Sequence, residues 1–350
     1  MPTYNQIYVP PARQQIAWGL EDTTAGTPPT TFQVERCKPS LALMSDMYKP
    51  EEYFGTGVST TDWIEMTHHA ELTLQFDVNL SGLCPSAIMS MLGDAANTGS
   101  ADTVSGTSPY IHTGVGGVKG TRCNTYSFPY QTGSGDVLHL TYGTVDSLKV
   151  TWAPNNPLKA ELKAICFFPD ADAVMPTVTQ PPKLDRVTSY AGVFNLQSSA
   201  GTAYASKVLS GGLTMTRNSK VTFSTSSGTQ QPLDIIPGEL TLTLDSIDLF
   251  YDGITSGHPY YDFLHKTAFG TSSSPNTLKW TDASAQSLEI DFWPAKWNTD
   301  VKFAETDNSL RIQGGIETYQ DYTTVTGTPG ALTAPSKIVV SNDVAGAYIV

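Results

Sequence analysis

Few residues of this chain have types and spacings that could support catalysis or metal binding. His68 and His69 are adjacent, so on a strand they would face opposite ways and could not share a metal. His258 and His265 could share a helical face, but no carboxylate or thiol stands at a ligand spacing beside them. GxSxG and HExxH motifs are missing, and no Ser or Cys has the context of an activated nucleophile. We therefore expect no enzyme: no catalytic residues, no metal site and no cofactor.

Two further features resemble chemical sites and have simpler interpretations. The run Gly114-Val115-Gly116-Gly117-Val118-Lys119-Gly120 fits neither GxGxxG nor GxxxxGK, so it is better explained as a flexible loop. Asp77 and Asp245 end two similar segments, and a catalytic carboxylate pair would need them within about 10 Å of each other. Duplication of the chain would instead place them apart, one in each domain.

Two segments among the elements that position these residues have the same sequence pattern. The segments Glu71–Asp77 and Glu239–Asp245 begin 239 − 71 = 168 residues apart, and both alternate apolar with polar residues. This period of two predicts a strand with one buried face and one solvated face. The expected core residues are Leu72, Leu74, Phe76, Leu240, Leu242 and Leu244. The expected solvent-facing residues are Glu71, Thr73, Gln75, Asp77, Glu239, Thr241, Thr243 and Asp245.

A short amphipathic helix ending in Gly is predicted after each strand, at 83–93 and 258–270. Ile88 with Leu92, and Leu264 with Ala268, are spaced i, i+4, so each pair should cover the sheet of its own domain. We predict that 31–170 and 185–345 superpose, with Leu74 and Leu242 in equivalent core positions.

The whole chain is predicted to be mainly β. We expect two tandem antiparallel β-sandwich or barrel domains, each with one short flanking helix. The predicted boundaries are an N-terminal arm at 1–30, a first domain at 31–170, a Pro-rich linker at 171–184 and a second domain at 185–350. Strands are expected at 32–34, 40–44, 63–78, 137–142, 147–152, 158–168, 212–217, 220–224, 239–245, 287–293, 310–318 and 337–340, and loops at 46–61, 94–118 and 271–276.

Composition limits the possible partners. The net charge is 20 − 33 = −13, which argues against a general duplex-binding surface. No apolar run is long enough to span a bilayer, so no membrane anchor is expected. The four cysteines, Cys37, Cys84, Cys123 and Cys166, show no CxxC spacing and are expected to be buried free thiols.

Several segments resemble tail tube proteins of long-tailed phages. They are Trp18-Gly19-Leu20-Glu21-Asp22-Thr23-Thr24-Ala25-Gly26-Thr27-Pro28, the Glu-Leu-Thr-Leu strand with its helix ending at Leu92-Gly93, and Tyr142-Gly143-Thr144-Val145-Asp146-Ser147-Leu148-Lys149-Val150. The resemblance implies a β-sandwich or barrel that forms rings, stacked into the conduit for DNA in the virion tail after assembly in the host cytoplasm. It implies no catalytic residues. Because the tube domain is expected twice, it also implies a trimeric ring with pseudo-sixfold symmetry, and other tail proteins at the tube ends.

In such a ring, the eight solvent-facing residues would line the lumen, where carboxylates and hydroxyls let DNA pass without specific binding. An ordinary solvated sheet face is the alternative. Two other functions stay open from the sequence. One is a different tail component on the same fold: a distal tail, baseplate hub or tail-tip protein. The other is a carbohydrate-binding adhesin, suggested by Trp63, Trp152, Trp280, Trp293 and Trp297.

Overall fold

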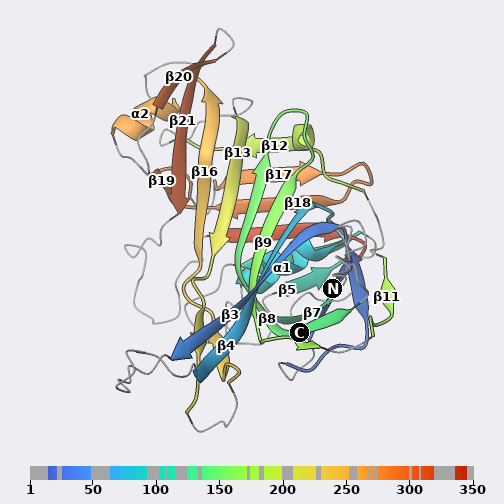
Figure 1. Cartoon of the computed structure of the whole chain (residues 1–350). Helices are drawn as coiled ribbons and strands as arrows, with labels where there is room; N and C mark the ends of the chain where they lie inside the picture. Colours follow the sequence, from blue (N-terminus) through green and yellow to red (C-terminus); the bar gives the residue numbers. More distant parts are fainter. Residues whose placement is uncertain are drawn as a thin grey trace, which may run out of the picture.

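The structure is a computed structural model of the 350-residue chain. It describes residues 15–21, 26–48, 64–92, 102–106, 109–115, 124–132, 136–171, 174–180, 185–198, 208–225, 230–251, 258–265, 268–271, 274–298, 302–306, 309–318 and 336–344. The described chain is dominated by antiparallel strands, with two α-helices (Figure 1). The expectation of a mainly β fold is confirmed.

The largest sheet contains a long antiparallel path that runs through both halves of the chain. Its strands, in spatial order, are β3 (Cys37–Tyr48), β4 (Ile64–Asp77), β9 (Lys159–Cys166), β8 (Val137–Trp152), β13 (Val208–Thr216), β16 (Thr241–Phe250) and β21 (Ser309–Thr318). The outer edge of β21 is paired by β19 (Ala295–Trp297) and then by β20 (Lys302–Thr306). Strands distant in sequence thus form one continuous surface.

This path consists of two strand sets with the same order. In the first set, β3-β4-β9-β8, the chain forms β3 and β4, passes through a helix, and returns as the β8–β9 hairpin. In the second set, β13-β16-β21-β19/β20, the chain forms β13 and β16, passes through a helix, and returns through β19 and β20 to β21. Because every neighbouring pair is antiparallel, corresponding strands run in the same direction. The two sets meet where β8 pairs with β13.

The first half of β8 carries a branch of the same sheet. Its strands are β7 (Thr125–Gln131), β1 (Gln15–Leu20), β2 (Phe32–Glu35), β11 (Val178–Thr179) and β10 (Asp170–Ala171). Two strands were expected at 137–142 and 147–152, but β8 is a single strand. Positive φ at Tyr142 and a register shift between Val145 and Ser147 bend it without ending it.

The prediction of an N-terminal arm at 1–30 differs from the structure at Gln15–Leu20. This segment is β1, which lies between β2 and β7, and its side chains from Ile16 to Gly19 are buried. Its apolar residues Ile16 and Trp18 belong to the hydrophobic core, so this segment is part of the sheet and not an arm. Residues 1–14 and 22–25 of the predicted arm lie outside the described residues. Part of the expected linker also pairs with the sheet, as β11.

A second sheet lies behind the long path, and its strands cross it at a steep angle (Figure 1). Its strands in order are β12 (Gly192–Asn195), β17 (Asn276–Thr281), β18 (Ser287–Phe292), β22 (Ser336–Asn342), β6 (Tyr110–Val115) and β5 (Asp102–Ser105). The loop predicted at 94–118 was therefore wrong for β5 and β6. β5 pairs with β6, and the pairing of β6 with β22 from the far end of the chain could not be read locally. A small hairpin of β14 (Lys220–Thr222) and β15 (Asp234–Ile236), and a 3-10 turn at Ser189–Ala191, complete the fold.

The first helix is completely buried. In α1 (Leu83–Leu92) every residue is buried, including Ile88 and Leu92, so the prediction that this pair covers the sheet is confirmed. The helix packs between β8 and β6, and a Cβ placed on Gly114 would come within 2.6 Å of the Leu92 side chain. Glu35 accepts a hydrogen bond from the Leu83 N–H at 3.1 Å, supplying the carboxylate that the helix's own first turn lacks.

The second helix differs from the prediction. α2 (Pro259–Leu264) has only six residues, and Leu264 is 53% exposed. Ala268 lies outside the helix, so the i, i+4 pair expected to cover the sheet does not form. Among the helix residues whose burial is described, Tyr261 to Leu264, Asp262 is the buried one, and the helix packs near β19. A helix of this length presents too narrow an apolar stripe to fix the face from sequence.

The two halves share one hydrophobic core. Leu74 is fully buried on β4 and Leu242 is buried on β16, and both belong to one continuous cluster. Both lie on the face of the long path that packs toward α1 and the second sheet. The opposite face of the long path carries polar side chains.

Candidate functional site

The polar face of the long sheet path carries a continuous row of side chains. Each member is the direct cross-strand partner of the next. The row is Lys38, Gln75, Glu161, Lys149, Thr214, Thr243, Glu317 and Lys296, one residue from each strand from β3 to β19. The first four belong to the first strand set and the last four to the second. Each set therefore ends in a Glu-Lys pair.

The structure brings the sequence-predicted polar residues together on this face. Glu71, Thr73, Gln75 and Asp77 alternate on β4 with buried Leu72, Leu74 and Phe76, and Thr241, Thr243 and Asp245 alternate on β16 with buried Leu242 and Leu244. Glu239 is exposed but precedes β16, and Leu240 is half-buried. The two strands belong to one sheet, which sequence reasoning did not anticipate.

Asp77 and Asp245 are too far apart to act as a catalytic pair. They lie in one cross-strand row, through Lys159, Thr151 and Gly212. Four strand spacings of about 4.8 Å separate them by roughly 19 Å. Asp77 instead forms an ion pair with Arg186 at 3.1 Å.

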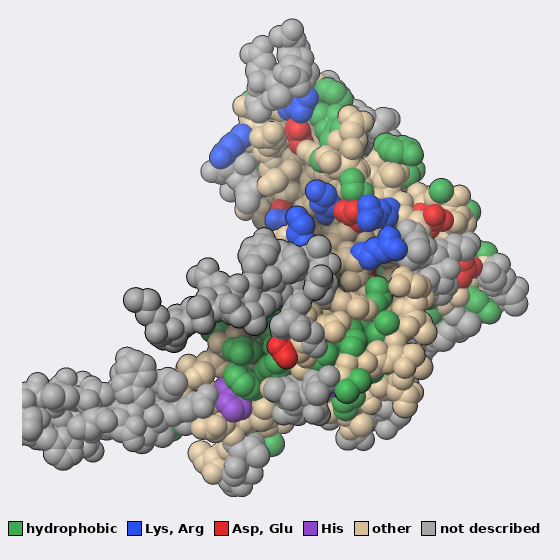
Figure 2. Space-filling model, turned by 45° about the vertical axis from the view of Figure 1, so that its right-hand side comes forward, with side chains coloured by type: hydrophobic (Ala, Val, Ile, Leu, Met, Phe, Trp, Pro, Cys, Tyr) green, Lys and Arg blue, Asp and Glu red, His purple; other side chains and the backbone are tan. Residues whose placement is uncertain are grey.

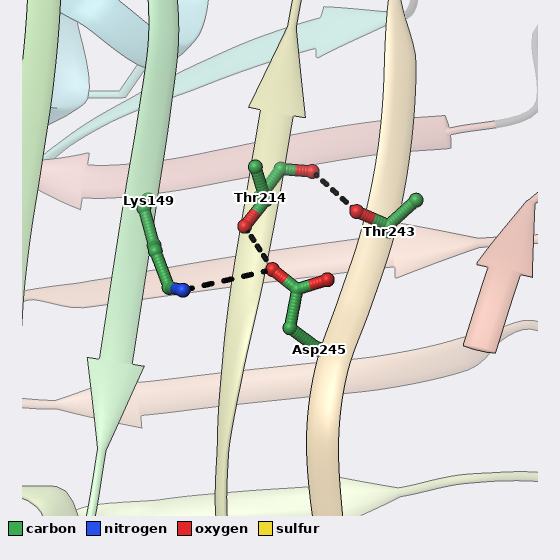
Figure 3. Close-up of polar contacts among 4 residues, drawn as sticks. All are labelled: Lys149, Thr214, Thr243 and Asp245. Carbon is green, nitrogen blue, oxygen red and sulfur yellow. Dashed lines mark hydrogen bonds and ion pairs between the residues drawn. The ribbon is translucent and has the colours of Figure 1, made fainter. Parts of the chain in front are cut away.

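Polar contacts on this face extend across neighbouring strands. Asp245 accepts a short hydrogen bond from the Thr214 hydroxyl, and the Lys149 ammonium lies 3.9 Å from the same carboxylate (Figure 3). Thr243 donates to the backbone carbonyl of Thr214 at 3.5 Å. In the first set, the Gln75 amide donates to Glu161 at 2.8 Å. These contacts are partly solvated, so each adds little stability, but together they fix the register of the face.

Sequence reasoning missed the lysines of this face. The cross-strand rows of this face contain five lysines, which lie among five carboxylates. The lysines are Lys38, Lys149, Lys159, Lys163 and Lys296, and the carboxylates are Glu71, Asp77, Glu161, Asp245 and Glu317. Figure 2 shows Lys and Arg side chains gathered near the middle of the visible face, with carboxylates between them. The alternation of Lys159, Glu161 and Lys163 was visible in the sequence. Their position beside Gln75 and Asp77 depends on strand pairing, which was not.

A shallow hollow opens on this face near the β3 edge. It has a volume of about 670 Å³ and is lined by Arg36, Lys38, Asp77, Lys159 and Glu161, among others. Its polar, open lining has the character of a sheet surface. Cys37 also lines it, but burial raises the pKa of this thiol to about 12, which makes it a poor nucleophile.

The other chemical candidates have structural roles. His68 and His69 are both half-buried and contact different neighbours: the His68 ring lies against Phe168, and His69 lies 4.0 Å from Glu71. His265 is exposed and stacks on Tyr261. Gly114 is a strand residue beneath α1, and residues 116–120 of the same run lie outside the described residues.

The described part of the chain holds no group of three or more His, Cys, Asp or Glu residues arranged to bind a metal. Within that same part, no helix has the length and apolarity needed to cross a membrane. Cys84 and Cys166 are buried, and burial raises the pKa of both thiols. Cys37 is half-buried, and burial followed by the nearby Glu35 charge raises its pKa to about 12. Cys123 lies outside the described residues.

Of the five tryptophans that suggested an adhesin, two are in the core. Trp152 and Trp280 are buried and pack with Phe194, at ring-centroid distances of 5.2 to 5.5 Å. Trp293 and Trp297 are half-buried, and Trp63 lies outside the described residues. Buried rings are not available for stacking against a sugar.

Comparisons with known proteins agree with this non-catalytic face. No curated protein matches the chain. The family model described as phage tail tube protein matches residues 11–252, more than half of the chain. The match extends from the segment containing β1 through β16, so it covers the first strand set and the beginning of the second. Proteins of this kind are structural parts of the virion tail and catalyse no reaction. The chain belongs to the phage tail tube protein family.

Proposed function

We propose that this protein is the major tail protein, whose copies form stacked rings that conduct DNA during ejection. The observation that carries the proposal is the long sheet path with one solvated, chemically inert polar face and two edges. In the described part of the chain, β3 pairs only with β4 and β20 pairs only with β21, while β19 pairs with β21 and is bridged on its other side at Ala295 by Phe269. Exposed sheet edges are ready pairing surfaces, and closing a ring removes them.

We infer that the two strand sets descend from a tandem duplication. Their order, their strand directions and their cross-strand rows support this inference. Lys149 faces Glu161 in the first set as Lys296 faces Glu317 in the second. The corresponding domains would be 31–170 and 185–350, with 171–184 as the linker, and the sheets that run between the halves would join them into one rigid unit.

Three copies would make a ring with pseudo-sixfold symmetry. Eight strand positions per chain give 24 strands for three copies. At a spacing of about 4.8 Å these enclose a circumference of roughly 115 Å, a backbone diameter of about 37 Å before strand tilt widens it. Two copies would give only about 24 Å, which leaves little room between two walls of side chains.

The polar face would line the lumen, because the opposite face of the path is covered by α1 and the second sheet. Glu71, Thr73, Gln75, Asp77, Glu239, Thr241, Thr243 and Asp245 are the proposed lumen residues, together with the lysines of the same rows. Carboxylates repel DNA phosphates, and each nearby lysine lowers that repulsion. The wall would therefore be close to neutral, so DNA would pass without specific binding.

Electron microscopy of the purified protein tests this proposal. Rings or tubes whose averaged sections show three chains and six similar lobes are expected. Copy number per particle separates a tube protein, present in many rings, from a distal tail, hub or tip protein present in one. A chain that remains monomeric at high concentration, or is present in particles as a single ring, would overturn the assignment.

A further inference from the structure

The hollow near the β3 edge has a charge balance opposite to that of the whole chain. Its described lining contains more cationic side chains than carboxylates, whereas the chain has 20 Lys and Arg against 33 Asp and Glu. The cations are Arg36, Lys38, Lys149 and Lys159, and the carboxylates are Asp77 and Glu161. This part of the surface therefore attracts anions, although the net charge of the protein repels them.

Strand pairing fixes the positions of these cations on the polar face. Lys38 on β3 and Lys149 on β8 lie in one cross-strand row, with two strands between them. Lys159 on β9 lies in the neighbouring row, opposite Asp77, and Arg36 immediately precedes β3. All four cationic side chains are exposed, so their charged groups are in solvent above a rigid sheet.

The two carboxylates of the hollow have other partners. Asp77 forms its ion pair with Arg186, at 3.1 Å, and Arg186 adds a further positive charge beside the hollow. Glu161 accepts a hydrogen bond from the Gln75 amide at 2.8 Å. Neither carboxylate therefore neutralises a lining cation by direct contact.

The cations of the lining are also largely unpaired. Within the described residues, Arg36, Lys38 and Lys159 form no ion pair. Lys149 lies 3.9 Å from Asp245, but both side chains are solvated, so this pair contributes little. Four positive charges thus remain available to an anion.

The hollow suits a nucleic-acid backbone better than an acidic peptide. The backbones of β4, β9 and β8 are paired on both sides there, so a peptide could not add a strand. Phosphates need only the cations. Phe76 is the aromatic residue of the described lining, and at 5% exposure it gives no surface on which an unpaired base could stack. These features fit the phosphates of duplex DNA, contacted without sequence preference.

We propose that this hollow binds the phosphate backbone of duplex DNA through Arg36, Lys38, Lys149 and Lys159. The inference rests on the proposed ring, in which this face lines the lumen, and it names the contact that DNA makes there. Each copy contributes one hollow, so a ring of three copies meets the DNA from three sides at one level. The contact is weak and independent of sequence, so DNA is kept near the axis and still slides.

The salt dependence of DNA binding tests the proposal. Each contacted phosphate of duplex DNA contributes about −0.9 to the slope of log affinity against log salt concentration. With four contacts, the affinity of the chain for a fluorescent duplex of about 20 base pairs should fall roughly 150-fold between about 50 and 200 mM salt, measured by anisotropy. Lys38→Gln with Lys159→Gln leaves two contacts, so the fall should be roughly 12-fold, and binding at about 50 mM salt should be at least tenfold weaker.

The matched control removes two exposed lysines outside the hollow. Lys220→Gln with Lys302→Gln gives the same net charge, and it should keep the wild-type salt slope and an affinity within about twofold of wild type. Glu161→Gln removes a carboxylate of the hollow and should strengthen binding by about threefold. Misfolding could not produce such a gain.

The outcomes separate this inference from the ring. Equal losses of affinity in the two lysine pairs would show that binding follows net charge alone, and would overturn the site. Tighter binding of a polyglutamate peptide than of the duplex would overturn it too, as would a wild-type chain that does not bind the duplex at about 50 mM salt. Rings seen by microscopy alongside any of these results leave the ring standing. A chain that binds the duplex through the hollow but forms no ring overturns the ring alone.

Discussion

Glu161 on β9 and Glu317 on β21 occupy the same position in the two strand sets, and each stands directly opposite a lysine. The two pairs lie in one row that crosses the whole polar face of the path. A positive charge thus accompanies a negative one at matching positions along this face. The face predicted from the two Glu-Leu-Thr-Leu segments alone is acidic, whereas the assembled face is mixed.

Reversing charge at Glu71 and Glu239 tests the lumen assignment. Glu71→Lys with Glu239→Lys should change the free energy of unfolding by no more than about 0.5 kcal/mol, because both side chains are exposed. Two carboxylates are replaced by two ammonium groups, so the net charge of each chain facing the channel rises by 2 + 2 = 4. DNA should therefore be attracted and its ejection slowed, less so at high salt. The measurement is the rate of DNA ejection from particles assembled with the variant.

The neutral pair Glu71→Gln with Glu239→Gln serves as the control and should give an intermediate rate. Ejection at the wild-type rate by the charge-reversed particles would exclude the polar face as the lumen wall. So would a tube structure that places both residues outside.

The two helices should respond differently to the same truncation. Ile88→Ala in α1 should lower the free energy of unfolding by about 2–5 kcal/mol, because Ile88 is fully buried. Leu264→Ala in α2 should change it by less than about 0.5 kcal/mol, because that side chain is 53% exposed. Urea midpoints of the two variants measure the difference. Equal losses would mean that α2 packs more deeply than its exposure indicates.

Glu35 should make stability depend on pH. Burial raises the pKa of Glu35 above its ordinary value of 4.5, against the smaller opposite effect of hydrogen bonds from the Leu83 and Arg36 N–H groups. The folded state therefore holds this proton more tightly than the unfolded state. The contribution of this pKa difference to the free energy of unfolding is fully present below pH 4.5, and it is lost as the pH rises through the folded-state pKa of Glu35.

Glu35→Gln keeps an oxygen for the Leu83 N–H and carries no charge. Its stability relative to wild type should therefore be more favourable at pH 7 than at pH 4. Chemical unfolding at the two pH values measures this difference. The same difference at both pH values would show that Glu35 titrates alike in the folded and unfolded states.

Exposed apolar side chains at opposite ends of the path should control ring stacking. Phe250 is the last residue of β16, Phe303 and Leu310 lie near the starts of β20 and β21, and all three are 40–45% exposed. Leu43, Met44 and Met66 lie at the opposite end, where β3 ends and β4 begins, and they are 41–53% exposed. Two different surfaces at opposite ends suit a head-to-tail contact, which continues into a filament because it does not close.

Phe303→Ser and Met66→Ser should therefore yield folded chains that form rings but shorter tubes, scored as length distributions by electron microscopy. Leu264→Ser, at an exposed site on α2, is the matched control and should leave tube length unchanged. Full-length tubes from both end variants would place the stacking contact elsewhere.

The sequence by itself determined the local elements whose pattern is strictly periodic. The alternation of Leu74 and Leu242 with polar neighbours predicted two strands and their buried faces, because a strand with one solvated face leaves that signature in the residues themselves. The helix carrying Ile88 was predicted for the same kind of reason. The family was also visible in short motifs, and the family match bore this out.

Only the tertiary structure decided which strands are neighbours. That β4 and β16 share a sheet, that β22 pairs with β6, and that Lys149 reaches Asp245 all depend on pairing between residues far apart in the chain. Strand pairing satisfies generic backbone groups, so the choice of partner leaves little trace in either strand's own sequence. The exposure of Leu264 was also decided only by the tertiary structure. Its i, i+4 spacing from Ala268 suited a core position, but α2 ends at Leu264 and leaves this side chain 53% exposed.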